Sequence, residues 1–104
     1  MITPETQEIQ QLAAEFYLLR DVVKALDLPN RERLHREAFA NFERLGTAIR
    51  ARGAVIETHR PISVFEGARP FVVLPNGLPV PPTHTRLDVE HRLAALIDAD
   101  TPPR

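Results

Sequence analysis

Apolar residues recur with the period of an α-helix along the first part of the chain. Thr3-Pro4-Glu5 is a helix start signal, in which a capping hydroxyl precedes proline at the first helical position. The apolar stripe that follows has alternating spacings of three and four: Ile9, Leu12, Phe16, Leu19, Val23 and Leu26. We therefore expect a first helix that ends near Leu28-Pro29.

Two apolar residues of this helix, Leu18 and Val22, lie off the stripe on a second patch. A single helical partner would not cover both surfaces, because they face different directions around the helix. Either the helix is buried over a wide front, or a second subunit covers the extra patch. We assign Leu18 and Val22 to a predicted oligomer interface.

A second helical pattern follows, with Asn30 as its predicted cap. Its stripe occupies an arc of about 80° and consists of Leu34, Ala38, Phe42, Leu45 and Ile49. Gly53 is a natural stop, since glycine tolerates the left-handed conformation after a helix. The short link at 28–30 favours an antiparallel hairpin over residues 1–53. Gly46 costs roughly 1 kcal/mol inside a helix, so it indicates a close helix approach or a bend.

After Gly53 the pattern changes to short runs rich in β-branched and aromatic residues. These runs predict strands at 54–58, 62–65 and 71–74. Asn76-Gly77 signals a tight turn. The prolines at 79, 81 and 82 exclude a central strand, so 78–83 is expected to be an edge segment or an extended connector. Residues 54–84 thus form a β segment followed by a proline-rich connector.

A last helix is predicted over residues 85–99. Thr85 and Asp88 resemble a capping box, with aspartate in place of the usual glutamate. Its apolar face consists of Val89, Leu93, Leu96 and Ile97. Residues 100–104 form a polar tail that is expected to fray. The chain of 104 residues is therefore predicted to be one α+β domain, since this length supports a single modest core.

Composition restricts the cellular compartment that we expect for the protein. There is no cysteine, which excludes disulfides and thiolate metal ligation. No apolar run is long enough to span a bilayer, and the start of the sequence has no basic segment followed by a hydrophobic one. We expect a cytoplasmic protein with no membrane association.

Catalytic and metal-binding patterns find little support. His84, Asp88 and His91 are spaced by four and three, as metal ligands on one helix face are, but this face is opposite the apolar stripe and is better interpreted as solvated. Ser63 is the only serine and has no elbow motif, and the four glycines form no phosphate-binding loop. We expect no metal, no cofactor and no enzymatic activity. A metal-dependent enzyme using those three residues is the remaining alternative in this class.

Arginine accounts for all but one of the 13 basic residues, and residues 31–60 are net basic. Arg33, Arg36 and Arg44 share the face of the second helix opposite its apolar stripe, and Arg50 lies at the edge of that face. These four residues are the predicted nucleic-acid contacts, since guanidinium groups bind phosphate well. The alternative is an ordinary solvated face, because Glu37 and Glu43 lie among the arginines.

The order of these elements resembles the phage terminase small subunit family. In that family a helical hairpin ends in glycine, a short β segment follows, and a proline-containing connector leads to a final helix. The residues that carry the resemblance are 34–39, 49–58, Asn76-Gly77, 81–84, 93–97 and the closing Thr101-Pro102-Pro103-Arg104. The segment 60–75 is longer than the corresponding β segment of the family.

This resemblance implies a non-enzymatic, ring-forming subunit for DNA packaging. Its partners would be double-stranded viral DNA and a large packaging subunit that carries the ATPase and nuclease activities. The residues alone support a second hypothesis, a small protein–protein interaction module or an antitoxin-like regulator that uses the hairpin or the edge segment as its surface.

Overall fold

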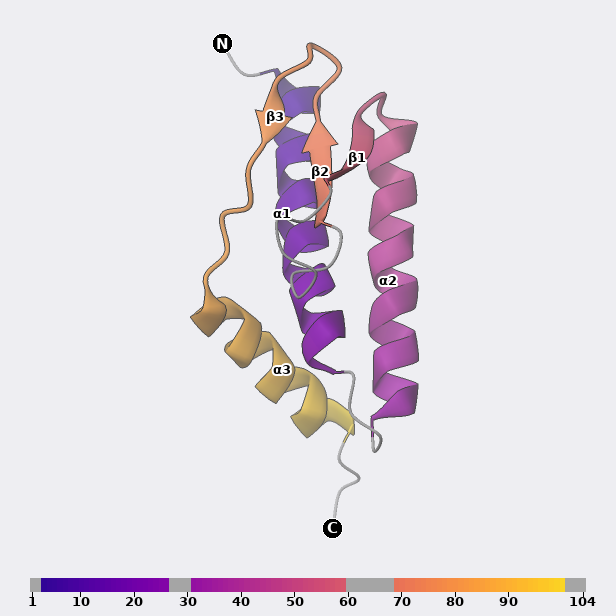
Figure 1. The fold of residues 1–104 in the computed structure, drawn as a ribbon, viewed down its shortest axis with the longest axis vertical. Coiled ribbons are helices and arrows are strands. Elements are labelled where there is room, and N and C mark those ends of the chain that lie inside the picture. The colour runs from indigo at the N-terminus through magenta and orange to yellow at the C-terminus, as the bar shows by residue number, and fades with distance from the viewer. Residues whose placement is uncertain (1–2, 27–30, 60–68, 101–104) are drawn as a thin grey trace.

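The computed structural model describes residues 3–26, 31–59 and 69–100. Its elements follow the predicted order of two long helices, a small sheet and a final helix (Figure 1). In chain order these are α1 (Pro4–Ala25), α2 (Glu32–Ala51), β1 (Val55–His59), β2 (Arg69–Val73), β3 (Pro79–Val80) and α3 (Arg86–Asp100). The predicted α+β fold class is confirmed.

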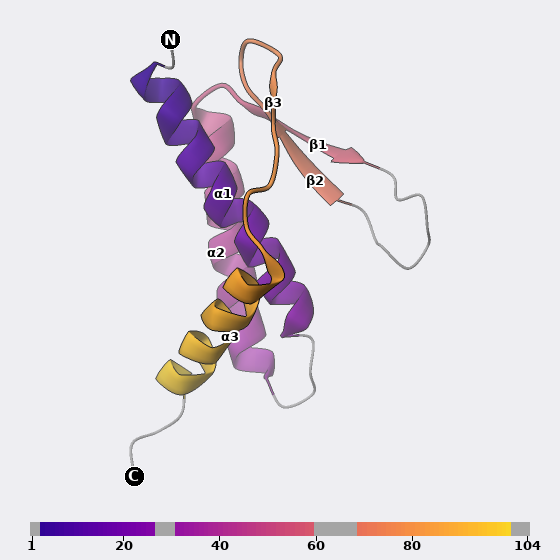
Figure 2. The same cartoon turned by 90° about the vertical axis from the view of Figure 1, so that its left-hand side faces the viewer.

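The helices α1 and α2 lie side by side as an antiparallel hairpin (Figures 1 and 2). The Thr3 hydroxyl accepts a hydrogen bond from the Thr6 amide at 3.1 Å, as the start signal predicts. Asn30, the predicted cap of α2, lies outside the described residues, and Arg31 directly precedes that helix. Gly53 has φ of 87°, the left-handed conformation that ends a helix.

The sheet is antiparallel with the order β1-β2-β3. Val55 pairs with Val73 and Val72 pairs with Val80, which places β3 on the outer edge, as its prolines require. The predicted strand at 62–65 falls outside the described residues. Beyond β3 the proline-rich connector runs extended toward α3 (Figure 2).

Two apolar clusters form the core, one after the other along the length of the hairpin. The first lies between the helices and the sheet and includes Ile9, Phe16, Tyr17, Ile49 and Val72. The second lies between the hairpin and α3 and includes Leu19, Val22, Leu26, Leu34 and Ala38, with Leu93, Leu96 and Ile97 of α3 packed against it. The first cluster packs the sheet against the hairpin, and the second packs α3 against the hairpin.

The second cluster changes the interpretation of the patch on α1. Val22 is fully buried in it, and Leu18 is half-buried against it, with Val89 and Leu93 of α3 packed on the same cluster. The last helix of the same chain therefore packs on the surface for which the sequence predicts a second subunit. Val22 has no exposed surface to offer such a contact, so its assignment to an oligomer interface does not fit this fold. The assignment of Leu18, which is half-buried, stays a prediction.

The helix α3 begins with the predicted reciprocal cap. The Thr85 amide donates to Oδ2 of Asp88 at 2.8 Å, and the Asp88 amide donates to the Thr85 hydroxyl at 3.3 Å. Within the described residues, no helix is long and apolar enough to cross a membrane.

Candidate protein-interaction groove

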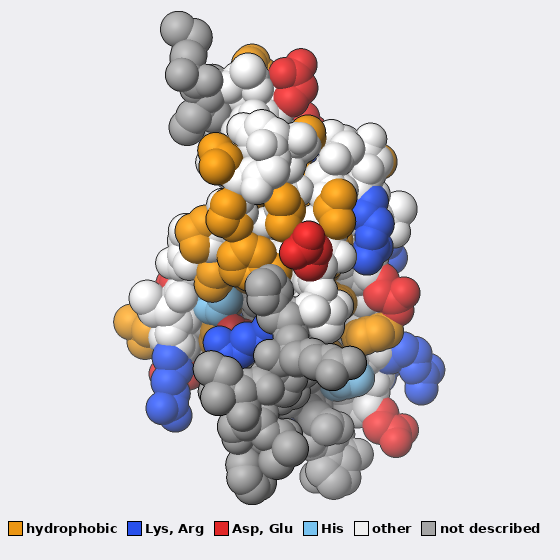
Figure 3. Space-filling view, turned by 45° about the horizontal axis from the view of Figure 1, so that its top comes forward, with side chains coloured by type: hydrophobic (Ala, Val, Ile, Leu, Met, Phe, Trp, Pro, Cys, Tyr) orange, Lys and Arg blue, Asp and Glu red, His pale blue; other side chains and the backbone are white. Residues whose placement is uncertain are grey.

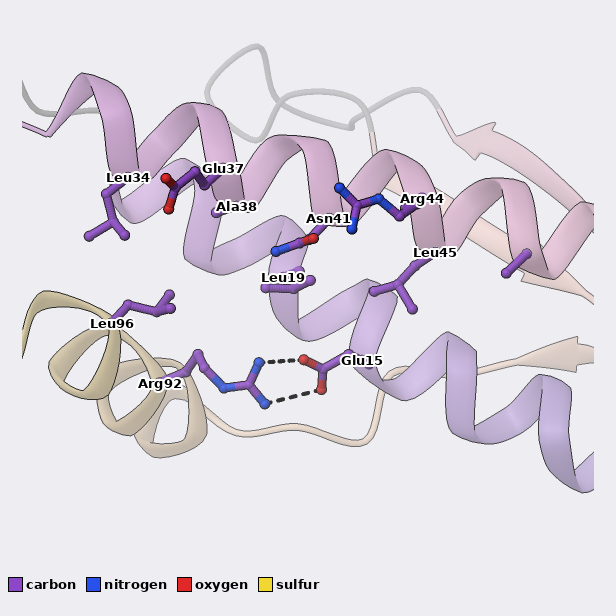
Figure 4. A pocket seen from close by; sticks show the side chains of 11 residues that line it. Glu15, Leu19, Leu34, Glu37, Ala38, Asn41, Arg44, Leu45, Arg92 and Leu96 are labelled. Carbon is purple, nitrogen blue, oxygen red and sulfur yellow. Dashed lines mark hydrogen bonds and ion pairs between the residues drawn. The ribbon is translucent and has the colours of Figure 1, made fainter. Parts of the chain in front are cut away.

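A hollow of about 490 Å³ runs along α2, bordered by α1 on one side and α3 on the other (Figure 4). We refer to it as the α2 groove. It is lined by Glu15, Leu19, Leu34, Glu37, Ala38, Asn41, Arg44, Leu45, Ala48, Arg92 and Leu96. Seven of the eleven residues come from one helix, so the groove follows the direction of α2 for about four turns.

The sequence of α2 explains why a groove forms beside it. Leu34, Ala38 and Leu45 belong to the buried stripe, and Ala38 and Ala48 are too short to fill the space toward α3. Leu19 of α1 and Leu96 of α3 close the apolar wall. An apolar hollow bordered by a few polar groups is the usual form of a binding site in proteins.

The wall opposite α2 carries an ion pair. Arg92 of α3 donates through both terminal nitrogens to the two carboxylate oxygens of Glu15 on α1, and the Nη2–Oε2 distance is 3.1 Å (Figure 4). This hydrogen bonding raises the pKa of Arg92. The pair joins α3 to α1 and leaves both charges satisfied, so it shapes the groove without offering a free charge to a partner.

The α2 side of the groove is different, because its charged side chains form no ion pair within the described residues. Glu37, Asn41 and Arg44 are exposed and lie along one line of the helix (Figure 4). Neither Glu37 nor Arg44 forms an ion pair with any other described residue. The groove therefore has an apolar floor and, on one rim, one acidic and one basic side chain available for contact.

The four arginines of the predicted nucleic-acid surface are all exposed on α2, but they do not form a single group. Arg33 donates to Asp100 at the end of α3, and this contact raises its pKa. Arg44 lines the groove, whereas Arg36 and Arg50 do not. Within the part of the chain that the structure describes, Arg36 and Arg50 also lack an ion pair.

Acidic residues interrupt the basic side chains on the surface. Figure 3 shows a face whose right-hand side alternates basic and acidic groups. Glu43 lies on α2 between Arg36 and Arg50, as the interpretation of a mixed solvated face expects. The described residues provide arginines for phosphate contact but form no continuous basic track.

A separate polar cluster lies where the connector meets α1. His84 Nε2 lies 2.5 Å from Oδ2 of Asp21, and Arg20 donates to Oδ1 of the same aspartate at 2.9 Å. The other ring nitrogen of His84, Nδ1, is buried and has no hydrogen-bond partner among the residues that the structure describes. The contact between His84 and Asp21 attaches the connector to α1.

His84, Asp88 and His91 do line one hollow, of about 400 Å³. Among the described residues, however, no group of three such side chains is placed so that it could hold a metal ion. His84 is turned toward Asp21 instead. The alternative of a metal centre therefore gains no support from the arrangement of these three residues.

Comparisons with protein-family models, curated proteins and solved structures found no match to this chain. The geometry of the molecule is thus the basis for its functional interpretation.

The sequence reasoning identified Arg44 but not the groove beside it. A signal for the groove is present, since Leu34, Glu37, Asn41, Arg44 and Ala48 recur at spacings of three and four. This second line lies next to the buried stripe of α2, and its small and polar members indicate a helix face that its own chain does not fully cover. Recognising the hollow also requires the position of α3, which no local pattern gives.

Proposed function

We propose that this protein is a non-enzymatic protein–protein interaction module that receives a helix of another chain in the α2 groove. The observation that carries the proposal is an apolar groove whose exposed rim holds two charges, Glu37 and Arg44, that form no ion pair with another described residue. Grooves between helices commonly bind one amphipathic helix, with apolar side chains in the hollow and polar ones at the rim. We further propose a cytoplasmic location, in keeping with the absence of cysteine.

Site-specific photo-crosslinking in expressing cells tests this function. A photoreactive phenylalanine derivative at Asn41 would lie in the groove, because Asn41 is one of its lining residues. The same derivative at Arg36, on the same helix but outside the groove, is the matched control. We expect a discrete polypeptide adduct from position 41 and a much weaker one from position 36. Equal adducts from both positions, or none from position 41, would contradict an interaction site in the groove.

A second candidate function is a DNA-packaging subunit similar to the terminase small subunit. Arg36 and Arg50, exposed and unpaired within the described residues, support it, and so does the order of hairpin, β segment, extended connector and final helix. In this proposal the protein assembles as a homo-oligomer, Arg33, Arg36, Arg44 and Arg50 contact double-stranded DNA, and the chain engages a large ATPase subunit.

Fluorescence anisotropy with a labelled DNA duplex over a series of salt concentrations tests the second candidate. Replacing Arg36 and Arg50 with glutamine should weaken binding and reduce the slope of log K against log salt by about two, because each phosphate contact contributes roughly 0.9 to it. Arg86→Gln, an exposed arginine on α3, is the control. If the variant at Arg36 and Arg50 binds DNA as well as the Arg86→Gln control does, the arginine surface of α2 is not a DNA-binding site.

A further inference from the structure

We propose that the occupant of the α2 groove is α2 of a second copy of this chain, held antiparallel about a twofold axis. The inference rests on the proposed interaction function and names the partner of that site. Its basis is the spacing of the two rim charges that lack an ion pair in the described part of the chain. Glu37 and Arg44 are seven residues apart, which is about two turns, so they lie on the same side of the helix about 10 Å apart.

An antiparallel twofold arrangement makes this pattern self-complementary. When two copies of α2 run in opposite directions with the axis near Asn41, Glu37 of each copy lies opposite Arg44 of the other. Two equivalent ion pairs then form across the interface, as a closed isologous contact requires. No other ligand chemistry is needed to satisfy both charges.

The charged residues Arg33 and Arg92 near this rim have other partners, so Glu37 and Arg44 remain available for contact with a second copy. Arg33 is one turn before Glu37 and acts on it electrostatically, but its guanidinium donates to Asp100. Arg92 is likewise engaged by Glu15 across the groove. Glu37 and Arg44 are therefore the charges on this rim that lack a hydrogen-bonded partner within the described residues.

The apolar part of the groove supplies the driving force for association. Leu34, Leu45 and Leu96 line it, and the short side chains of Ala38 and Ala48 allow the second helix to approach closely. Burial of apolar surface would provide most of the affinity, and the paired charges would fix the register and the antiparallel direction. This dimer is isologous, which distinguishes it from the ring that the terminase resemblance implies.

The solvent-facing side of α2 provides a matched control. Arg36 and Glu43 are also seven residues apart and exposed, but neither lines the groove. Reversing those charges changes the same residue types on the same helix without touching the proposed interface. The groove side of α2 is favoured as the dimer interface because it combines the charge pattern with apolar surface.

The test measures mass by light scattering during size-exclusion chromatography, over a series of protein concentrations. Wild type should form a dimer. Glu37→Arg alone and Arg44→Glu alone each create two like-charge contacts, so each should raise the dimer dissociation constant at least about 100-fold. Native mass spectrometry of an equimolar mixture of these two variants should show the heterodimer, in which both ion pairs are restored. Arg36→Glu and Glu43→Arg should leave the mass unchanged.

Each contrary result has a distinct meaning. Single variants that stay dimeric, a mixture that forms no heterodimer, or a mass that responds to Arg36 and Glu43 instead would overturn the proposed pairing. A monomeric wild type that still crosslinks to a different polypeptide from position 41 would overturn self-pairing and leave the interaction function standing. A monomer without any adduct from position 41 would overturn both.

Discussion

The hydroxyl of Tyr17 on α1 donates a hydrogen bond to the carbonyl oxygen of Val80 in β3, at an O–O distance of 2.5 Å. The same hydroxyl accepts from the Val72 amide of β2 at 2.7 Å. The side chain is almost completely buried, so one phenol joins the first helix to two strands more than fifty residues away. The edge strand, and with it the start of the proline-rich connector, is attached to the helical hairpin at this point.

Replacing Tyr17 with phenylalanine should lower the free energy of unfolding by about 1–3 kcal/mol. The ring still fills the core, but the Val72 amide and the Val80 carbonyl lose a partner in a buried site. Urea denaturation would measure the change. Thr58→Val removes an exposed hydroxyl from β1 and should stay within about 0.5 kcal/mol. Equal losses for the two variants would show that the phenol does not stabilise the sheet.

The same hydroxyl predicts a dependence of stability on alkaline pH. Burial raises the pKa of Tyr17, with the Val72 hydrogen bond acting in the opposite direction. The folded state therefore keeps its proton to higher pH than the unfolded state, whose tyrosine ionises near pH 10. The contribution is fully present below that pH and is lost as the pH rises through the raised pKa. Denaturation series from pH 8 to pH 11 should show this loss in wild type, and less of it in Tyr17→Phe.

Val22 distinguishes a core position from an intersubunit contact. Because the side chain is fully buried, Val22→Ala should cost about 2 kcal/mol of stability through lost burial and a residual cavity. The cost should not depend on protein concentration, since α3 of the same chain packs on the cluster that contains Val22. Leu87→Ala, at a leucine that is 57% exposed, is the control and should cost much less. Concentration-dependent destabilisation by Val22→Ala would restore the interface interpretation.

The ion pair of Arg92 and Glu15 should contribute little to stability despite its bidentate geometry. Both side chains are more than one third exposed, so solvent screens the charges. Glu15→Gln should lower the free energy of unfolding by less than about 1 kcal/mol, and high salt should reduce the difference. Glu90→Gln, which disrupts the more exposed pair with Arg86, should have no measurable effect. A loss of several kcal/mol for Glu15→Gln would mean that the pair is needed to seat α3.

Local chemistry explains which parts of this fold the sequence predicts. The cap at Thr3, the reciprocal cap of Thr85 and Asp88, and the stop at Gly53 depend on neighbouring residues, and the structure has all three. The burial of Val22 depends on α3, more than sixty residues later in the chain. Periodicity identifies an apolar patch, but it does not say whether the same chain or another one covers it.

The candidate site also has one part that the sequence predicts and another that depends on tertiary packing. Arg44 is apparent from the charge pattern of one helix, whereas the hollow beside it exists only because α3 crosses the hairpin and places Arg92 and Leu96 opposite α2. The link from His84 to Asp21 is likewise a contact between distant segments, and it turns His84 toward α1 although His84, Asp88 and His91 line one hollow. Spacing along one element indicates candidate residues, and tertiary packing decides which of them face each other.

Gly46 shows how a single position combines helix propensity with packing. A Cβ at this position would lie 3.3 Å from Cε1 of Phe16 and 3.5 Å from Cδ1 of Ile56, so the glycine permits the close approach that the sequence suggested. For Gly46→Ala, a gain of roughly 1 kcal/mol in helix propensity offsets this crowding, and the net change should be less than about 1 kcal/mol. For Gly46→Val, two further methyl groups should overpack the core and cost about 1–3 kcal/mol.

The control for this position is Ala40→Val, at an exposed site of the same helix, which measures the propensity cost of valine without the packing cost. Urea unfolding of Gly46→Ala, Gly46→Val and Ala40→Val separates the propensity cost from the packing cost. Only Gly46→Val places a β-branched side chain against the Phe16 ring. If Gly46→Val were no less stable than Ala40→Val, the contact between α2 and Phe16 would be loose enough to accept a side chain. The glycine would then have no role in the approach of the helices.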